Sequence, residues 1–271
     1  MERVREAMEQ ALKQKWSPSE RVEPINPTLR RRRAAQSSDE PRRQSGERFR
    51  YINIDPRTLS SNKLIVADKA HPHRGAYGVL QANVLTAMND GHWTSIGVTS
   101  PSSGSGKTLT AMNLAAALAT LSRKKVLLLD LDVGHPDIHG YFNYEPDFGL
   151  EDVLFDGATV EKAAFKPGLE DLVVLPVRGS KNNARQVLRS DNLRSALTSI
   201  KTDYPDYLVV ANLPAISGAD AATLYSSLVD CILLVAEDSV TRVAHYRKTL
   251  DALDKTKLVG TVLNRTKSES N

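Results

Sequence analysis

Residues 96–119 read IGVTSPSSGSGKTLTAMNLAAALA and combine an apolar run, a loop of small residues and an apolar helical pattern. This order predicts a strand, a phosphate-binding loop and a helix that opens at Lys107 and Thr108. In such a loop, successive backbone N–H groups converge on phosphate oxygens, the lysine contacts the phosphates, and the hydroxyl holds Mg²⁺. Pro101 replaces the usual first glycine, but the GSGKT core is intact. The stretch therefore predicts a nucleotide-binding site.

Short apolar runs alternate with helical patterns on both sides of this loop. The runs are rich in Val, Ile and Leu without strict alternation, as is typical of parallel strands covered on both faces. They are 94–100, 126–130, 172–176, 207–211, 232–237 and 258–264, and the helical patterns are 107–122, 190–201, 219–228 and 240–254. The alternation predicts an α/β fold of the P-loop NTPase kind, a mostly parallel sheet flanked by helices on both faces.

Charge divides the chain into a basic N-terminal tail, residues 1–50, and a nucleotide-binding domain, residues 51–271. The tail has 13 Lys/Arg against 8 Asp/Glu, whereas the whole chain has a net charge of only +4. Segment 1–16 predicts a short amphipathic helix because four apolar residues recur at helical spacing: Val4, Met8, Leu12 and Trp16. Segment 17–50 is rich in Pro, Ser and Arg, which predicts a largely disordered linker.

The basic tail has two interpretations. It either attracts anionic lipid or nucleic acid, or serves as a solvated tether. Nucleic acid is the less favoured partner, because the arginines at 30–33 have no interleaved aromatic residues. The single cysteine, the lack of a secretory signal and the lack of an apolar run of ~20 residues predict a cytoplasmic protein, peripheral at the membrane if a partner recruits it.

A pair of acids follows the second core strand, in VLLLDLDVGHPD (126–137). Asp130 and Asp132 leave the sheet at the carboxyl end of the strand, where ligands bind in folds of this kind. One carboxylate could then face Mg²⁺ or its water, and the other the attacking group. The alternative is that one or both acids cap the following turn.

The order of these motifs resembles the bacterial tyrosine kinases (BY-kinases), which belong to the wider class of MinD/ParA-type P-loop ATPases. The resemblance runs from about residue 70 to 265. Segment 139–142, followed by segment 149–157, is more particular to the kinases than to their ATPase relatives, and Pro101 agrees with the loop of the kinases. The matching stretches are 96–119, VLLLDLDVGHPDIHGYF (126–142), GLEDVLFDG (149–157), LVVLPVRGSKNN (172–183), YLVVANLP (207–214), LVDCILLVAE (228–237) and VGTVLN (259–264).

The resemblance implies ATP and Mg²⁺ as cofactors and assigns site residues by position. It implies that Thr108 and Asp130 hold Mg²⁺, and that Lys107, Asp130 and Asp132 act in catalysis. The Asn264 amide would read the adenine edge, because it can both donate and accept a hydrogen bond; a strand-end turn is the alternative. The implied nucleotide-binding residues are Ser103, Gly104, Ser105, Gly106, Lys107, Thr108, Leu109 and Asn264.

Three departures from the BY-kinase pattern bear on catalysis and assembly. The third acidic motif of that family has an aspartate where this chain has Ala211, which implies weaker positioning of the metal and a gain of Mg²⁺-dependent turnover in Ala211→Asp. Segment 75–83, GAYGVLQAN, lacks the charges that pair neighbouring subunits, which argues against a charge-paired ring. No tyrosine follows Tyr246, whereas autophosphorylating members carry a C-terminal tyrosine cluster.

Three functions are compatible with these features. The resemblance implies an ATP-binding protein with weakened catalysis that regulates exopolysaccharide or capsule synthesis or export beside a membrane chain-length or export protein. The second is an active tyrosine kinase or slow ATPase of the same pathway, for which two aspartates suffice. The third, ranked lowest, is a ParA/MinD-like partitioning ATPase. Self-association through the nucleotide face stays open.

Overall fold

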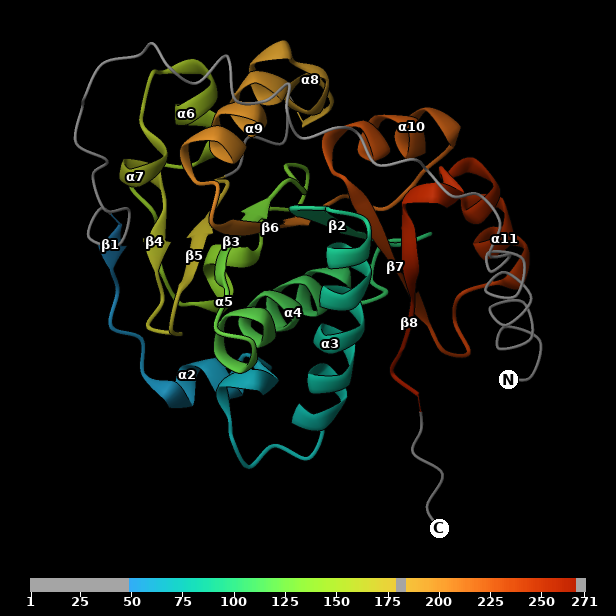
Figure 1. Ribbon diagram of the computed structural model, residues 1–271, viewed down its shortest axis with the longest axis horizontal. Helices are drawn as coiled ribbons and strands as arrows, with labels where there is room; N and C mark the ends of the chain where they lie inside the picture. Colours follow the sequence, from blue (N-terminus) through green and yellow to red (C-terminus); the bar gives the residue numbers. More distant parts are fainter. Residues whose placement is uncertain (1–48, 179–183, 267–271) are drawn as a thin grey trace, which may run out of the picture.

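An eight-stranded sheet runs through the centre of the protein (Figure 1). The structure, a computed structural model, describes residues 49–178 and 184–266. The strand order is β1-β4-β5-β3-β6-β2-β7-β8, and every neighbouring pair is parallel except β4 and β5. The predicted mostly parallel sheet is therefore confirmed. The strands are β1 Arg50–Tyr51, β2 Ser95–Thr99, β3 Lys125–Asp130, β4 Phe165–Lys166, β5 Leu172–Leu175, β6 Tyr207–Asn212, β7 Cys231–Glu237 and β8 Leu258–Asn264.

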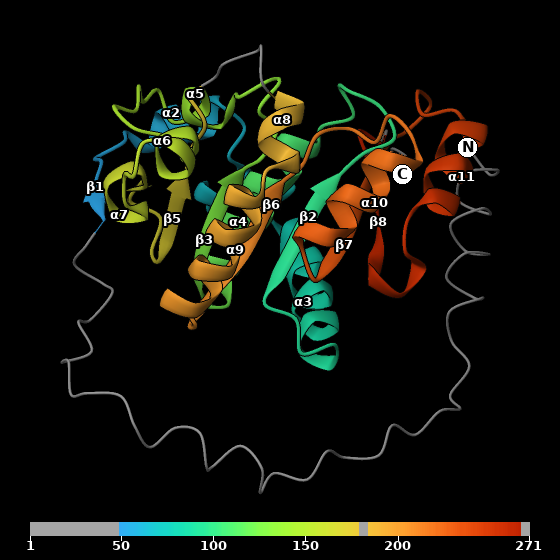
Figure 2. The same cartoon turned by 90° about the horizontal axis from the view of Figure 1, so that it is seen from above.

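Helices cover both faces of this sheet, as the sequence predicts (Figures 1 and 2). One face carries α2 Pro56–Ser61, η3 Ile65–Ala67, α3 Arg74–Asp90, α4 Lys107–Leu121 and α5 Ile138–Tyr141. The other face carries α6 Leu150–Phe155, α7 Val160–Ala163, α8 Ala184–Arg189, α9 Asp191–Asp203, α10 Ala219–Leu228 and α11 Val243–Ala252, and the short helix η4 Lys255–Lys257 precedes β8. Among the described residues, none of these helices has the length and apolar character needed to cross a membrane.

Each face of the sheet has its own apolar core, and successive residues of one strand alternate between the two. The α4-side core contains Leu128 and Val210 together with the buried face of α4. The α10-side core contains Leu129, Ala211 and the residues of α9 and α10 that cover them. The position of a residue in its strand therefore determines whether its side chain lies on the α4 side or on the α10 side of the sheet.

Helix α4 packs closely on the sheet because it is rich in alanine. Ala is the strongest helix former, and its small side chain lets the helix axis approach the strands. All five alanines of α4 are buried, namely Ala111, Ala115, Ala116, Ala117 and Ala119. The close packing fixes the first turn of α4 directly behind the end of β2, where the phosphate loop begins.

The six predicted core strands and the four predicted helices are all present, with ends shifted by at most a few residues. The sequence patterns did not predict β1, β4 or the 17-residue helix α3. The amphipathic helix predicted at 1–16 and most of the predicted linker lie outside the described residues. The described residues begin at Phe49, which packs on Tyr204 and Tyr207.

Candidate nucleotide-binding site

The loop between β2 and α4 has the conformation of a tight phosphate-binding turn. Gly104 and Gly106 have φ angles of 85° and 87°, a region that favours glycine. Ser105 is buried and donates a hydrogen bond from Oγ to the Ser102 carbonyl oxygen (3.0 Å). Ser103 is exposed at the tip of the loop. The small residues of 102–106 thus fold the backbone over the end of β2.

Helix α4 begins at Lys107, so Thr108 and Leu109 form its first turn, where backbone N–H groups have no partner within the helix. The Lys107 side chain is buried, and Nζ donates to Oδ2 of Asp132, which is also buried. His135 lies at the rim, with Nδ1 3.7 Å from the other Asp132 oxygen. The structure therefore brings the loop lysine and the second acid of 126–137 into direct contact.

Asp130 ends β3 two residues before Asp132 and is fully buried. Its carboxylate accepts hydrogen bonds from the backbone N–H groups of Asp132 (3.1 Å) and Ile138 (3.4 Å), so the expected turn-capping contacts are present. Asn212 Nδ2 donates to the same carboxylate at 3.0 Å. Burial raises the pKa of Asp130 to about 6, although these hydrogen bonds favour the charged form.

Asn212 is a site residue that the sequence interpretation missed. It is in register with Asp130 on the neighbouring strand, and its side chain is fully buried. Its Oδ1 is buried without a hydrogen-bond partner in the described part of the chain. A buried acceptor without a donor is uncommon in proteins and often marks a place for water or an ion. The polar residue at the end of the apolar run YLVVAN was the signal in the sequence.

Ala211, the position at which the resemblance expects an acid, faces the α10-side core. It is in register with Leu129 and Gly97, and its exposed fraction is 0%. A Cβ at Gly97 would lie 2.4 Å from Leu213 Cδ1, which shows how tightly Leu213 fills this space. The β6 residue beside Asp130 is therefore Asn212. The sequence interpretation matched the aspartate of the third acidic motif to Ala211, one position earlier.

Asn264 ends β8 and contacts the phosphate loop from the side. Its Nδ2 donates to the Ser105 carbonyl oxygen (3.0 Å), and its Oδ1 accepts from the backbone N–H of Arg265 (2.9 Å). Both ends of the amide are thus engaged within the protein. The structure therefore assigns Asn264 a role in holding the loop. The sequence interpretation gave it only adenine recognition or a strand-end turn.

We expect Gly106→Ala to destabilise the folded protein more than Gly104→Ala. Both changes place a Cβ at positive φ, at a cost of roughly 1–2 kcal/mol. Only at Gly106 would the new Cβ meet a neighbour, Asn264 Nδ2 at 2.1 Å, whereas nothing lies within 4 Å at Gly104. Asn264 must then leave Ser105, which adds about 0.5–1.5 kcal/mol. Urea unfolding of both variants measures the difference, and equal losses would contradict the holding role of Asn264.

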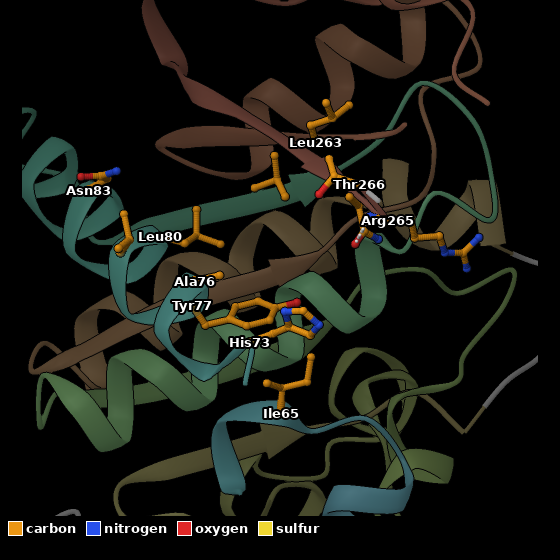
Figure 3. Close-up of a pocket in the computed structure, with 12 residues that line it drawn as sticks. Ile65, His73, Ala76, Tyr77, Leu80, Asn83, Leu263, Arg265 and Thr266 are labelled. Atoms are coloured by element: carbon orange, nitrogen blue, oxygen red, sulfur yellow. Dashed lines mark hydrogen bonds between the residues drawn. The ribbon is translucent and has the colours of Figure 1, made fainter. Parts of the chain in front are cut away.

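Two hollows flank the phosphate loop. One, of about 450 Å³, is lined by Ser102, Ser103, Asp132 and His135, with Tyr225 and His245 on the α10–α11 side. The other, of similar size, lies between α3 and β8 (Figure 3), and Asn264 is among the residues that line it. Both are within the usual size range of small-molecule sites. The first hollow thus includes residues of the phosphate loop, whereas the second reaches the loop through Asn264, which contacts Ser105.

Segment 149–157 forms the start of α6 and has a structural explanation. Gly149 N–H donates to Asp152 Oδ2 (2.7 Å), and Arg178 Nη2 donates to Asp152 Oδ1 (2.7 Å). A Cβ at Gly149 would lie 3.0 Å from the Pro176 carbonyl oxygen, so a larger residue there would require a small shift of the helix end away from the end of β5. This motif therefore fixes α6 to the sheet beside the nucleotide end.

These features agree with the comparisons to known proteins. Residues 96–271 match the CobQ/CobB/MinD/ParA nucleotide binding domain, and the chain belongs to this family. Among solved structures, the chimerical protein CapA2B2 has a TM-score of 0.68 at 25% identity, covering 80% of this chain and 93% of that one. MinD complexed with Mg-ADP from Pyrococcus horikoshii OT3 has a TM-score of 0.54 at 25% identity, covering 65% of this chain and 71% of that one.

Within that family, the chain falls with the bacterial tyrosine kinases. It is 31% identical over 208 residues to the tyrosine-protein kinase YwqD of Bacillus subtilis (strain 168), covering 76% of this chain and 86% of YwqD. It is 29% identical over 166 residues to the succinoglycan biosynthesis transport protein ExoP of Rhizobium meliloti (strain 1021), covering 59% of this chain and 21% of ExoP. The resemblance stated from the motifs is thereby confirmed.

Proposed function

We propose that the protein binds ATP with Mg²⁺ at the phosphate loop and regulates surface-polysaccharide synthesis or export beside a membrane partner, with weakened phosphoryl transfer. The observation that carries the weakened transfer is the side chain beside Asp130 on β6, which is the amide of Asn212 and not a carboxylate, while Ala211 is buried in the α10-side core. The polysaccharide pathway and the membrane partner are proposed from the name of ExoP.

The loop geometry supports ATP as the ligand. Lys107 would exchange Asp132 for phosphate oxygens, which also carry negative charge, so the ammonium group would stay paired. The backbone N–H groups from Ser103 to Leu109 would bind the phosphates at the N-terminal end of α4. Asn264 would lie beside the base while it holds the loop.

The oxygen atoms on the α4 side fit Mg²⁺, which prefers hard oxygen ligands and keeps several waters. Thr108 and Asp130 would hold the ion, directly or through water, and the unpartnered Oδ1 of Asn212 offers a further acceptor. Bound Mg²⁺ would neutralise part of the phosphate charge. Asn212 would also keep the Asp130 carboxylate in a fixed orientation through its amide group.

An active tyrosine kinase is the second candidate. The contact between Lys107 and Asp132 and the 31% identity to YwqD favour it. In that case Asp130 and Asp132 would supply the acidic groups without a third carboxylate. The two candidates share the same ATP site and differ only in whether a phosphoryl group is transferred.

The test combines binding with transfer. We expect a fluorescent ATP analogue to bind in an Mg²⁺-dependent manner, and we expect no phosphotyrosine on the protein or on an added tyrosine polymer after incubation with Mg-ATP. Lys107→Ala is the negative control, and an active bacterial tyrosine kinase is the positive one. A phosphotyrosine signal that disappears in Lys107→Ala would establish the active kinase instead. Absence of ATP binding would overturn both candidates.

A further inference from the structure

Helix α3 and the edge strand β8 form the two walls of an apolar groove (Figure 3). Ala76, Tyr77 and Leu80 come from α3, and Val262 and Leu263 come from β8. Within residues 49–178 and 184–266, no strand pairs with the outer side of β8, and every residue of β8 is partly exposed. The groove therefore leaves apolar surface of a helix and of a sheet edge in contact with solvent, although a monomer would usually cover such surface.

The exposed face of α3 also lacks charge. From Gly75 to Asn89 the helix contains no Asp, Glu, Lys, Arg or His. Val79 lines the groove and is 64% exposed. A surface helix of this length normally presents charged residues to water, and depletion of charge is characteristic of the centre of a binding interface. The helix surface is thus suited to an apolar occupant.

We propose that the occupant of this groove is the chain's own N-terminal segment 1–16, bound as an amphipathic helix. Apolar residues recur in this segment at the spacing of one helical face: Val4, Ala7, Met8, Ala11, Leu12 and Trp16. An amphipathic helix that lays such a face into an apolar groove is a common mode of recognition. The inference rests on the groove and the sequence pattern and does not require the proposed function.

The connection between the segment and the groove has a suitable length. The described chain begins beside β1, at the edge of the sheet opposite β8, and with eight strands the two edges lie about 34 Å apart at ~4.8 Å per strand. Residues 17–48 connect the segment to that edge, and a flexible chain of this length has a root-mean-square span of about 31 Å. Since span and distance agree, the effective concentration of the segment at the groove is near its maximum.

The test uses Trp16 as the reporter in the full-length protein. The chain has two tryptophans, so Trp93→Phe leaves Trp16 as the sole one. We expect Trp16 to be shielded from acrylamide, and we expect Val79→Glu to release it, because the docked segment would bury the new carboxylate. The ratio of docked to undocked segment should fall at least ~10-fold. Val240→Glu is the matched control, since Val240 is also 64% exposed but does not line the groove.

A second variant tests the other partner of the contact. Met8→Glu changes the segment and not the described domain, and it should release Trp16 as Val79→Glu does. Trp16 that is already accessible in the parent protein would overturn the proposal, as would equal effects of Val79→Glu and Val240→Glu. Shielding that requires high protein concentration would assign the groove to a second copy, and shielding only with anionic vesicles would assign the segment to a membrane. Either result would also overturn it.

Discussion

We expect Lys107→Ala to lower the affinity for ATP at least ~10-fold and to destabilise the folded protein at the same time. The affinity falls because a charge-assisted contact to phosphate is worth about 1.5–3 kcal/mol. The stability falls because Asp132, only 3% exposed, loses its partner and remains a buried charge. Removal of one member of a buried pair costs roughly 3–5 kcal/mol. ATP titration and urea unfolding measure the two effects separately.

The double variant Lys107→Ala with Asp132→Asn separates these roles. Without the unpaired carboxylate, most of the lost free energy of unfolding should return, but the affinity for ATP should stay low because the cation is still missing. If the double variant binds ATP as the unmodified protein does, Lys107 serves only to neutralise Asp132. Loss of stability in the double variant as large as in Lys107→Ala would show that the buried pair is not the cause.

We expect Ala211→Asp to reduce the free energy of unfolding by roughly 3–5 kcal/mol at neutral pH, as an unpaired buried charge does, and to leave Mg²⁺-dependent turnover no higher. This reverses the expectation from the family pattern alone. The carboxylate would enter the α10-side core next to Leu129 and Leu213, where the structure shows no cationic partner among the described residues that surround it. Denaturant unfolding and a phosphate-release assay measure the two outcomes.

Ala211→Asn is the matched control, because it adds a side chain of the same shape without a charge. It should destabilise the protein less than Ala211→Asp, and the difference should shrink as acid protonates the aspartate. A stable Ala211→Asp protein with increased turnover would mean that position 211 does reach the metal. In that case the missing carboxylate alone would account for weakened catalysis.

The central sheet could be predicted from the sequence because its strands are buried on both faces. Runs such as 126–130 and 232–237 are continuously apolar, and a doubly covered strand has no polar face to interrupt the pattern. Helix α3 could not be predicted in the same way. Only Val84 and Met88 of its 17 residues are buried, and Gly75 and Gly78 lower its helix propensity. Its contacts with α4 make it a helix.

The phosphate loop and the two acids could likewise be predicted, since local spacing determines them. The roles of the acids could not, because they depend on which neighbours lie across the sheet. Asp132 contacts Lys107, whereas Asp130 contacts Asn212, which is 82 positions away in the chain. The contact between Asp130 and Asn212 results from the register of β3 and β6. The sequence pattern of either strand alone does not predict that register.

The hydrogen bond between Asn264 and Ser105 joins positions that are 159 residues apart. During synthesis the loop leaves the ribosome long before β8 does, so for that interval Ser105 has no amide to hold its carbonyl group. A nascent chain that has not yet added its last strand should therefore bind nucleotide poorly, even with the whole loop and α4 already folded. The ability to bind ATP would then indicate that β8 has joined the sheet.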